Sequence, residues 1–121
     1  MSASPAEVVV QRQLEAYNRR DLETVIATYA DDAQQFEHPN TLLASGAAHI
    51  KERLQVRFQE PNLHAQLLHR IVLGHLVMDH ERVTRTFPEG PGTIELVATY
   101  EVVHGRITRH WVAFAEKVLD A

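Results

Sequence analysis

A change in the period of the sequence after Pro61 is the feature that most limits the fold. Beyond it, four segments are rich in Val, Ile, Thr and aromatic residues, as β-strands are. These segments are residues 63–73, 76–87, 93–103 and 106–115. Short turns separate them, at Gly74-His75, residues 88–92 and His104-Gly105. Since strands joined by short turns pair with their neighbours, we predict an antiparallel meander.

Before Pro61 the chain carries helix signals instead. Ser4 fits an N-cap, Pro5 the first helical position and Glu7 a capping box, so a first helix is predicted to run to about Arg19. Its apolar stripe contains one polar residue, Gln13, on a face that should point inward.

Two further helices and a short strand complete the first half. Asp21 is the expected N-cap of a helix from Leu22 to about Ala30. Residues 34–38 fit a short strand, and Ser45-Gly46 opens a third helix. Three helices followed by a meander predict an α+β fold in which the helices cover one face of a curved sheet.

Length and composition exclude several classes of protein. The chain is long enough for one domain, residues 1–121, with a modest core. Its acids and bases are interspersed, with a formal net charge of −4, which argues against a nucleic-acid partner. No apolar run reaches the roughly 18 residues of a membrane span, and no basic segment precedes the first apolar run, so we expect neither a membrane segment nor a signal peptide. The lack of cysteine excludes disulfides and thiolate chemistry and fits a cytoplasmic location.

The eight histidines do not have the spacing of metal ligands. Metal sites place histidines four residues apart on a helix or two apart on a strand, with a third ligand nearby. The spacings here are His64 to His69, His75 to His80 and His104 to His110. None of them follows either rule, so we expect no metal site.

Four stretches together resemble one protein superfamily. They are VVQRQLEAYNRRDLETVIATYADDA (residues 9–33), EHP (37–39), SGAAHIKERL (45–54) and YEVVHGRITRHWVAFAEK (100–117). They look like the nuclear-transport-factor-2-like superfamily, with the SnoaL-like proteins and the ketosteroid isomerases as the nearest branches. The resemblance implies a cone-shaped, mainly antiparallel sheet that three N-terminal helices close on one side. It also implies an apolar pocket of small-molecule size, used without an organic cofactor.

The catalytic residues of ketosteroid isomerases are replaced in this chain. The base of those enzymes lies directly before the proline that follows the second helix, and this position is His38 here. Their oxyanion tyrosine falls on Gln13 and their protonated acid on Ala98. Because such donors typically contribute a factor of about 100 to 1,000 each, we expect no ketosteroid isomerase activity.

His38 is the predicted general base, since imidazole titrates near neutral pH. The proline after it favours extended geometry, so residues 36–38 should alternate between two faces. Phe36 is the apolar member and should face the core. We therefore expect His38 to line the pocket with it, and Glu37 to point outward.

The resemblance places further residues on the pocket wall. His110 would be a second titratable group and would form an acid/base pair with His38; a histidine in solvent at a strand end is the alternative. The expected ligand contacts are Gln13, Tyr17, Tyr29, Phe36, Leu54, Ala98, Tyr100, Val112 and Phe114. For Gln13 the alternative is a hydrogen bond to the backbone, and for the tyrosines it is a place in the core.

Two other features concern the sheet surface. Trp111 is expected to face out of the cone, and an exposed aromatic residue on a sheet suggests an interface, so we predict a homodimer through this face. On a strand, Asp79 and Glu81 share one face and His80 takes the other, so these neighbours cannot act as a triad. We interpret this segment as a solvated strand, with the face of His80 left open.

The functional prediction is a pocket protein for a small hydrophobic carbonyl compound. The reaction would be proton transfer with His38 as base, in a cofactor-independent isomerase, cyclase or lyase. The alternatives are a non-catalytic ligand-binding protein and a dimerisation module of the same fold. The sequence leaves open whether the protein is an enzyme.

Overall fold

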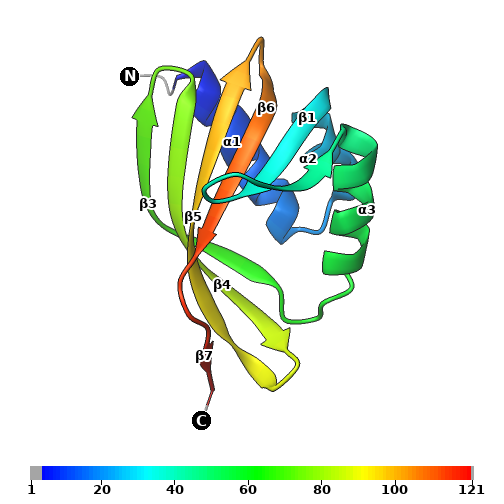
Figure 1. Cartoon of the computed structure of the whole chain (residues 1–121), viewed down its shortest axis with the longest axis vertical. Coiled ribbons are helices and arrows are strands. Elements are labelled where there is room, and N and C mark those ends of the chain that lie inside the picture. Colours follow the sequence, from blue (N-terminus) through cyan, green and yellow to red (C-terminus); the bar gives the residue numbers. More distant parts are fainter. Residues whose placement is uncertain (1–3, 121) are drawn as a thin grey trace.

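The meander predicted after Pro61 forms four long strands in the computed structural model, which describes residues 4–120. They are β3 (His64–Leu73), β4 (Leu76–Phe87), β5 (Gly90–Val103) and β6 (Arg106–Phe114). Each strand pairs antiparallel with the next one along the chain. The predicted curved and mainly antiparallel sheet is therefore confirmed (Figure 1).

Three further strands complete the sheet within residues 4–120. β1 (Tyr29–Glu37) pairs in parallel with β6 and antiparallel with β2 (Thr41–Ser45). β7 (Val118–Leu119) pairs with β5. The order β2-β1-β6-β5-β4-β3 brings the first strand of the chain beside the last long one.

Helices cover one side of this sheet. They are α1 (Pro5–Asn18), α2 (Leu22–Ala27) and α3 (Ala47–Arg57). The hydroxyl of Ser4 accepts the backbone N–H of Glu7 at 3.1 Å, so the predicted N-cap of α1 is confirmed. In Figure 1, α1 crosses behind the strands and α3 stands beside β1. The predicted α+β cone is confirmed by this arrangement.

The second helix is shorter than predicted, and the strand after it is longer. α2 ends at Ala27 rather than near Ala30, and β1 already begins at Tyr29. The cause is long-range pairing, because the N–H of Ile107 donates to the carbonyl of Thr28 at 2.7 Å and draws this segment into the sheet. β2 and β7 were not predicted, since neither carries a local signal strong enough to stand out.

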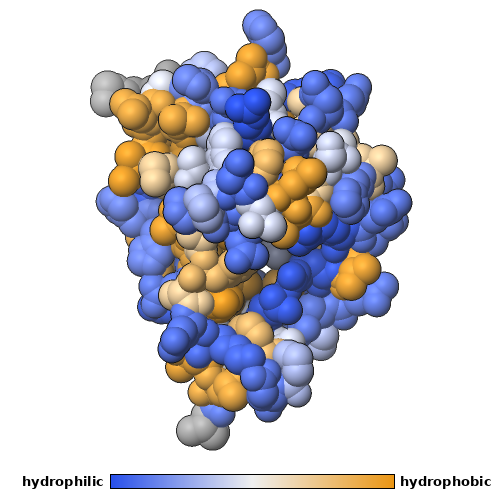
Figure 2. Space-filling view, in the orientation of Figure 1, coloured by the Kyte–Doolittle hydropathy of each residue, from blue (hydrophilic) through white to orange (hydrophobic). Residues whose placement is uncertain are grey.

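The core lies between the helices and the inward face of the strands. Val10 of α1, Ile50 of α3, Val77 of β4 and Ile107 of β6 are fully buried. Apolar residues also reach the surface, as Figure 2 shows at the upper left, where the β3–β4 hairpin ends. Exposed Leu73 lies at this end. The inward face is not filled completely, and a cavity remains inside the cone.

Candidate functional site

A cavity of about 310 Å³ lies between the helices and the sheet. Side chains of α1, α3 and the inward faces of β1, β4, β5 and β6 line it. A volume of this size is at the lower end of the range for small-molecule sites. The lining includes ten residues selected from the sequence: Gln13, Tyr17, Tyr29, Phe36, Leu54, Ala98, Tyr100, His110, Val112 and Phe114. Their roles in binding or catalysis stay predictions.

His38 is not on the cavity lining, and its expected orientation is wrong. His38 and Glu37 are both exposed, and of the two only Glu37 lines the cavity. Phe36 also lines the cavity, as predicted, so residues 36–38 do not alternate simply between two faces. Glu37 lies opposite Val112 of β6, which is another lining residue. Phe36 lies opposite Trp111, and their rings stack at 5.9 Å between centroids. The geometry therefore does not support His38 as a base for a ligand in the cavity.

His110 presents an unpaired nitrogen inside the cone. Its ring stacks on Tyr100 with 4.4 Å between centroids. Its Nδ1 lies 3.3 Å from the hydroxyl of Tyr29 and 3.2 Å from Nε2 of Gln35. Its Nε2 is buried and has no hydrogen-bond partner among residues 4–120. Such an orphaned group is available to a ligand.

The contacts of His110 define its protonation. Burial lowers the pKa of His110 to about 4, with a smaller contribution from the positive charge of Arg53, so the ring is neutral at pH 7. An amide nitrogen only donates hydrogen bonds, so Nδ1 accepts from Gln35. The single proton of the neutral ring is then on Nε2. His110, which lines the cavity, therefore carries a buried N–H donor that has no partner among residues 4–120.

Glu81 of β4 is the site residue that sequence reasoning missed. Its side chain is 6% exposed and lines the cavity. Burial, followed by the charge of Asp79, raises the pKa of Glu81 to about 8, while the charge of Arg70 opposes the shift. The interpretation of residues 79–81 as a solvated strand is wrong. A signal was present, because strand alternation places Glu81 on the same face as the apolar Val77 and Val83.

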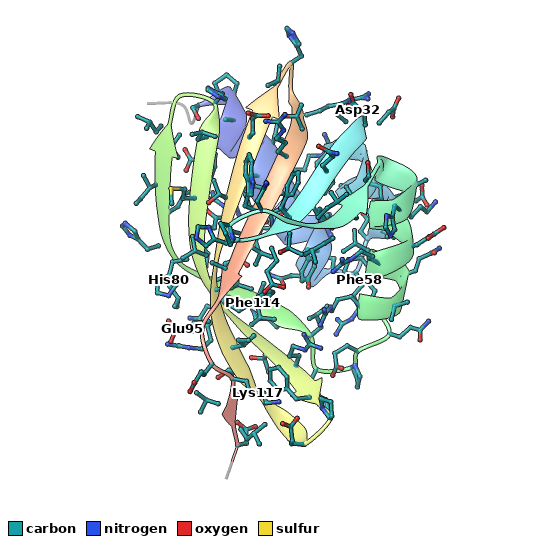
Figure 3. All side chains as sticks on the ribbon, viewed as in Figure 1. Asp32, Phe58, His80, Glu95, Phe114 and Lys117 are labelled. Atoms are coloured by element: carbon teal, nitrogen blue, oxygen red, sulfur yellow. The ribbon has the colours of Figure 1, made fainter. Side chains whose placement is uncertain are left out.

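His80 and Asp79 have different roles from Glu81. His80 points out of the cone, where its Nε2 lies 2.7 Å from a carboxylate oxygen of Glu95 (Figure 3). Asp79 is buried in a bidentate pair with Arg70, at 2.6 and 2.9 Å. Arg70 also donates to Gln11 of α1 at 2.9 Å. This pair joins β3 and β4 to α1, while Glu81 stays available to a ligand.

Two tyrosines and a glutamine add neutral polar groups to the wall. Tyr100 donates from its hydroxyl to Oε1 of Gln13 at 3.4 Å, and both residues are buried. Burial raises the pKa of Tyr100 and of Tyr29, so both keep their protons. The backbone hydrogen bond considered for Gln13 is replaced by this side-chain contact.

Other classes of site receive no support from the geometry. Residues 4–120 contain no group of three or more His, Asp or Glu side chains placed to hold a metal ion. In the same described range, no helix is long and apolar enough to cross a membrane. Trp111 is half-buried and is not among the lining residues of the cavity. A dimer interface that includes Trp111 would therefore lie on the outer face of the sheet.

One family and many solved structures match this chain. The model of the SnoaL-like domain matches residues 10–110. A comparison with curated proteins found no match. An uncharacterized cystatin fold protein from Novosphingobium aromaticivorans has a TM-score of 0.80 and 23% identity, covering 95% of this chain and 100% of that one.

Two further structures have names that describe reactions. An LEH-like epoxide hydrolase from M. tuberculosis has a TM-score of 0.77 and 20% identity, covering 92% of this chain and 83% of its own. A putative SnoaL-like polyketide cyclase from Shewanella putrefaciens has a TM-score of 0.77 and 16% identity, and the match covers 93% of this chain and 91% of that one. At these identities the likeness shows the fold alone.

Proposed function

The chain belongs to the SnoaL-like domain family, and from this premise we propose that it is a cofactor-independent proton-transfer enzyme. Its substrate is a small hydrophobic carbonyl compound, and its reaction is that of an isomerase, cyclase or lyase. One observation carries the proposal: Glu81 and His110 line the same cavity, and burial shifts their pKa values in opposite directions. Titratable groups driven apart in this way are typical of acid–base sites.

Glu81 is the base in this mechanism. A carboxylate with a pKa of about 8 is a much stronger base than an exposed one. It removes a proton from the carbon beside the substrate carbonyl, so the C–H bond breaks and an O–H bond forms on Glu81. The electron pair moves into an enolate, and return of the proton to the same carbon gives exchange. In a substrate with a β,γ double bond the intermediate is a dienolate, and return of the proton to its γ-carbon completes an isomerisation.

His110 is the electrophile that stabilises the enolate. Its Nε2–H is buried and unpaired within the described residues, and so it is free to donate to the oxygen where negative charge develops. A neutral imidazole can do this because it is not ionised beforehand. One such donor typically contributes a factor of about 100 to 1,000. Gln35 and Tyr29 position the ring through Nδ1.

The proposed base is Glu81, whereas the sequence pattern predicted His38. The proposed chemistry is compatible with the reactions that the names of two fold relatives describe. His38 is exposed and has no part in it. An epoxide hydrolase and a putative polyketide cyclase share the fold, and both names describe chemistry on small molecules. The open cavity argues against a dimerisation module with a filled cone. A non-catalytic ligand-binding protein is the competing function.

Exchange of substrate hydrogen with solvent tests the proposal. Small apolar ketones, such as 2-tetralone and phenylacetone, are incubated with the protein in D2O, and loss of the signal of the hydrogens beside the carbonyl is followed by proton NMR. Exchange should be catalysed and should speed up as pH rises toward 8, since ionised Glu81 is the active form.

Three variants assign the roles. Glu81→Gln should slow exchange by at least about 100-fold, because the base is lost. His110→Phe keeps a ring to stack on Tyr100 but loses the donor, and should slow it by about 100-fold. His38→Ala is the control and should exchange at the wild-type rate. Full activity of Glu81→Gln, or a protein that binds ketones without any exchange, would leave only the binding function.

A further inference from the structure

Three arginines stand together at one end of the cavity. Arg53 and Arg57 of α3 and Arg85 of β4 all contribute to its lining. The same three residues also line an adjoining hollow of about 560 Å³, together with Glu60 and neighbouring residues. Figure 2 shows strongly hydrophilic residues on the right of the molecule, the side on which Figure 1 places α3. The cluster therefore lies where the cavity opens into a second depression.

The positive charge of this cluster is poorly compensated. Within residues 4–120, none of the three arginines takes part in an ion pair. Nε of Arg85 is buried without a hydrogen-bond partner in this described range, while its guanidinium lies 4.9 Å from the ring centre of Phe87. Burial, followed by repulsion from Arg57, lowers the pKa of Arg85. Two guanidinium groups that repel each other and lack an acidic partner are placed to share an anion.

Nearby acids do not fill this role. Glu60 lines the adjoining hollow, and its charge raises the pKa of Arg85, but less than burial and Arg57 lower it. Within the described residues, Glu60 forms no ion pair with the three arginines, and its carboxylate accepts the backbone N–H of Thr86 at 3.0 Å. Glu81 lies in the same cavity, and burial raises its pKa to about 8, so most of it carries no charge at pH 7. Arg53 donates to the backbone carbonyl of Leu43 at 3.0 Å, which holds this side chain in place.

We propose that the arginine cluster binds an oxyanion head group, a carboxylate or phosphate, of a ligand whose apolar body lies in the cone. Guanidinium groups match the planar fork of a carboxylate and the oxygens of a phosphate. The apolar side chains of Leu54, Ile94 and Leu96 line the cavity beside the cluster. This inference rests on the proposed function and narrows its substrate class to amphipathic acids.

Binding of matched ligands tests the inference without requiring turnover. Calorimetry compares octanoate and octyl phosphate with the neutral octanamide, which has the same chain. We expect at least one anion to bind roughly tenfold or more tightly than the amide, as for a charge-assisted contact. Added salt should weaken the binding of the anion and leave the binding of the amide unchanged. Which anion binds more tightly identifies the head group.

Two variants locate the head group. Arg57→Gln and Arg85→Gln should each remove most of the preference for the anion, with little effect on the amide. The control is Arg12→Gln, at an exposed position of α1 outside the cavity lining. If Arg85→Gln fails to fold, because Arg85 also packs on Phe87, then Arg57→Gln at the last turn of α3 decides the matter.

The outcomes separate this inference from the proposed function. Equal affinities for acids and amide, a preference that survives both substitutions, or no binding of any of these ligands at millimolar concentration would overturn it. Exchange of neutral ketones together with equal affinities would support the enzyme and reject the anion site. A strong anion preference without exchange of any ketone would support the site and reject the enzyme.

Discussion

The side-chain amide of Gln35 lies 3.2 Å from Nδ1 of His110, although the two residues are 75 positions apart in the chain. They face each other across the parallel pair of β1 and β6. The amide nitrogen of Gln35 donates to this ring nitrogen, so the proton of the neutral ring lies on Nε2, the buried nitrogen that has no partner among residues 4–120. The predicted chemistry of His110 depends on this contact.

Gln35→Glu should raise the pKa of His110. A carboxylate beside Nδ1 attracts the imidazolium and accepts a hydrogen bond from Nδ1–H, so it opposes the effect of burial. NMR titration of the imidazole nitrogens measures this pKa and shows which nitrogen is protonated. The control is Gln34→Glu, since Gln34 lies opposite Arg109 rather than His110 and is not on the cavity lining. If the pKa of His110 is unchanged in Gln35→Glu, then the contact between residue 35 and Nδ1 does not determine the protonation of the ring.

Glu81→Gln should change how stability depends on pH. The pKa of Glu81 is raised from 4.5 to about 8 in the folded protein, so between these values the folded state keeps a proton that the unfolded chain releases. The free energy of unfolding of the wild type therefore falls as pH rises through this window and levels off above about pH 8. At about 1.4 kcal/mol per pKa unit, the titration of Glu81 changes the free energy of unfolding by at most about 5 kcal/mol.

The glutamine variant lacks this titration. Glu81→Gln should match the wild type near pH 5 and should be more stable at pH 9 by a few kcal/mol, since the uncharged amide has a similar shape. Urea denaturation at several pH values measures the difference. Glu52→Gln, at an exposed position of α3, is the control and should follow the wild-type curve. Parallel curves for Glu81→Gln and the wild type would refute the shifted titration.

Asp79→Ala should destabilise the fold strongly. It leaves the guanidinium of Arg70, which is 9% exposed, without its bidentate partner. Removal of one member of a buried ion pair typically costs about 3–5 kcal/mol. Replacing both members, as in Arg70→Met with Asp79→Leu, should recover much of this loss. Denaturation in urea tests both, with Glu95→Ala as control at the exposed pair with His80, where about 1 kcal/mol or less is expected.

We propose that the protein forms a homodimer through the outer face of the sheet, which includes Trp111. Met78 and Val97 of this face are 40% and 37% exposed, and Met78, Thr99 and Trp111 lie in one row across β4, β5 and β6. Light scattering at tens of micromolar should give twice the 13.7 kDa mass of the chain. Met78→Lys with Val97→Lys should give the monomer mass, whereas Val8→Lys on α1 should not. A monomeric wild type would contradict the proposal.

Local signals in the sequence determined most of the fold. The cap of α1 at Ser4 depends on contacts within one turn, and the meander of β3 to β6 depends on short turns between neighbouring strands. Such features can be predicted because the interacting residues are close in the chain. The cone and its pocket were not predicted from local signals; they were implied by the resemblance of four stretches to a known superfamily.

Only the tertiary structure decided that Glu81, and not His38, lies on the cavity lining. Alternation correctly grouped Asp79 with Glu81, but it wrongly grouped Phe36, which lines the cavity, with His38, which does not. Which residues line the cavity depends on partners far away in the chain: pairing with β6 places Glu37, and not His38, on the cavity lining, and Glu81 is buried in the closed cone. The protonation of Glu81 and His110 follows from the same burial, since desolvation acts only after the cone has closed.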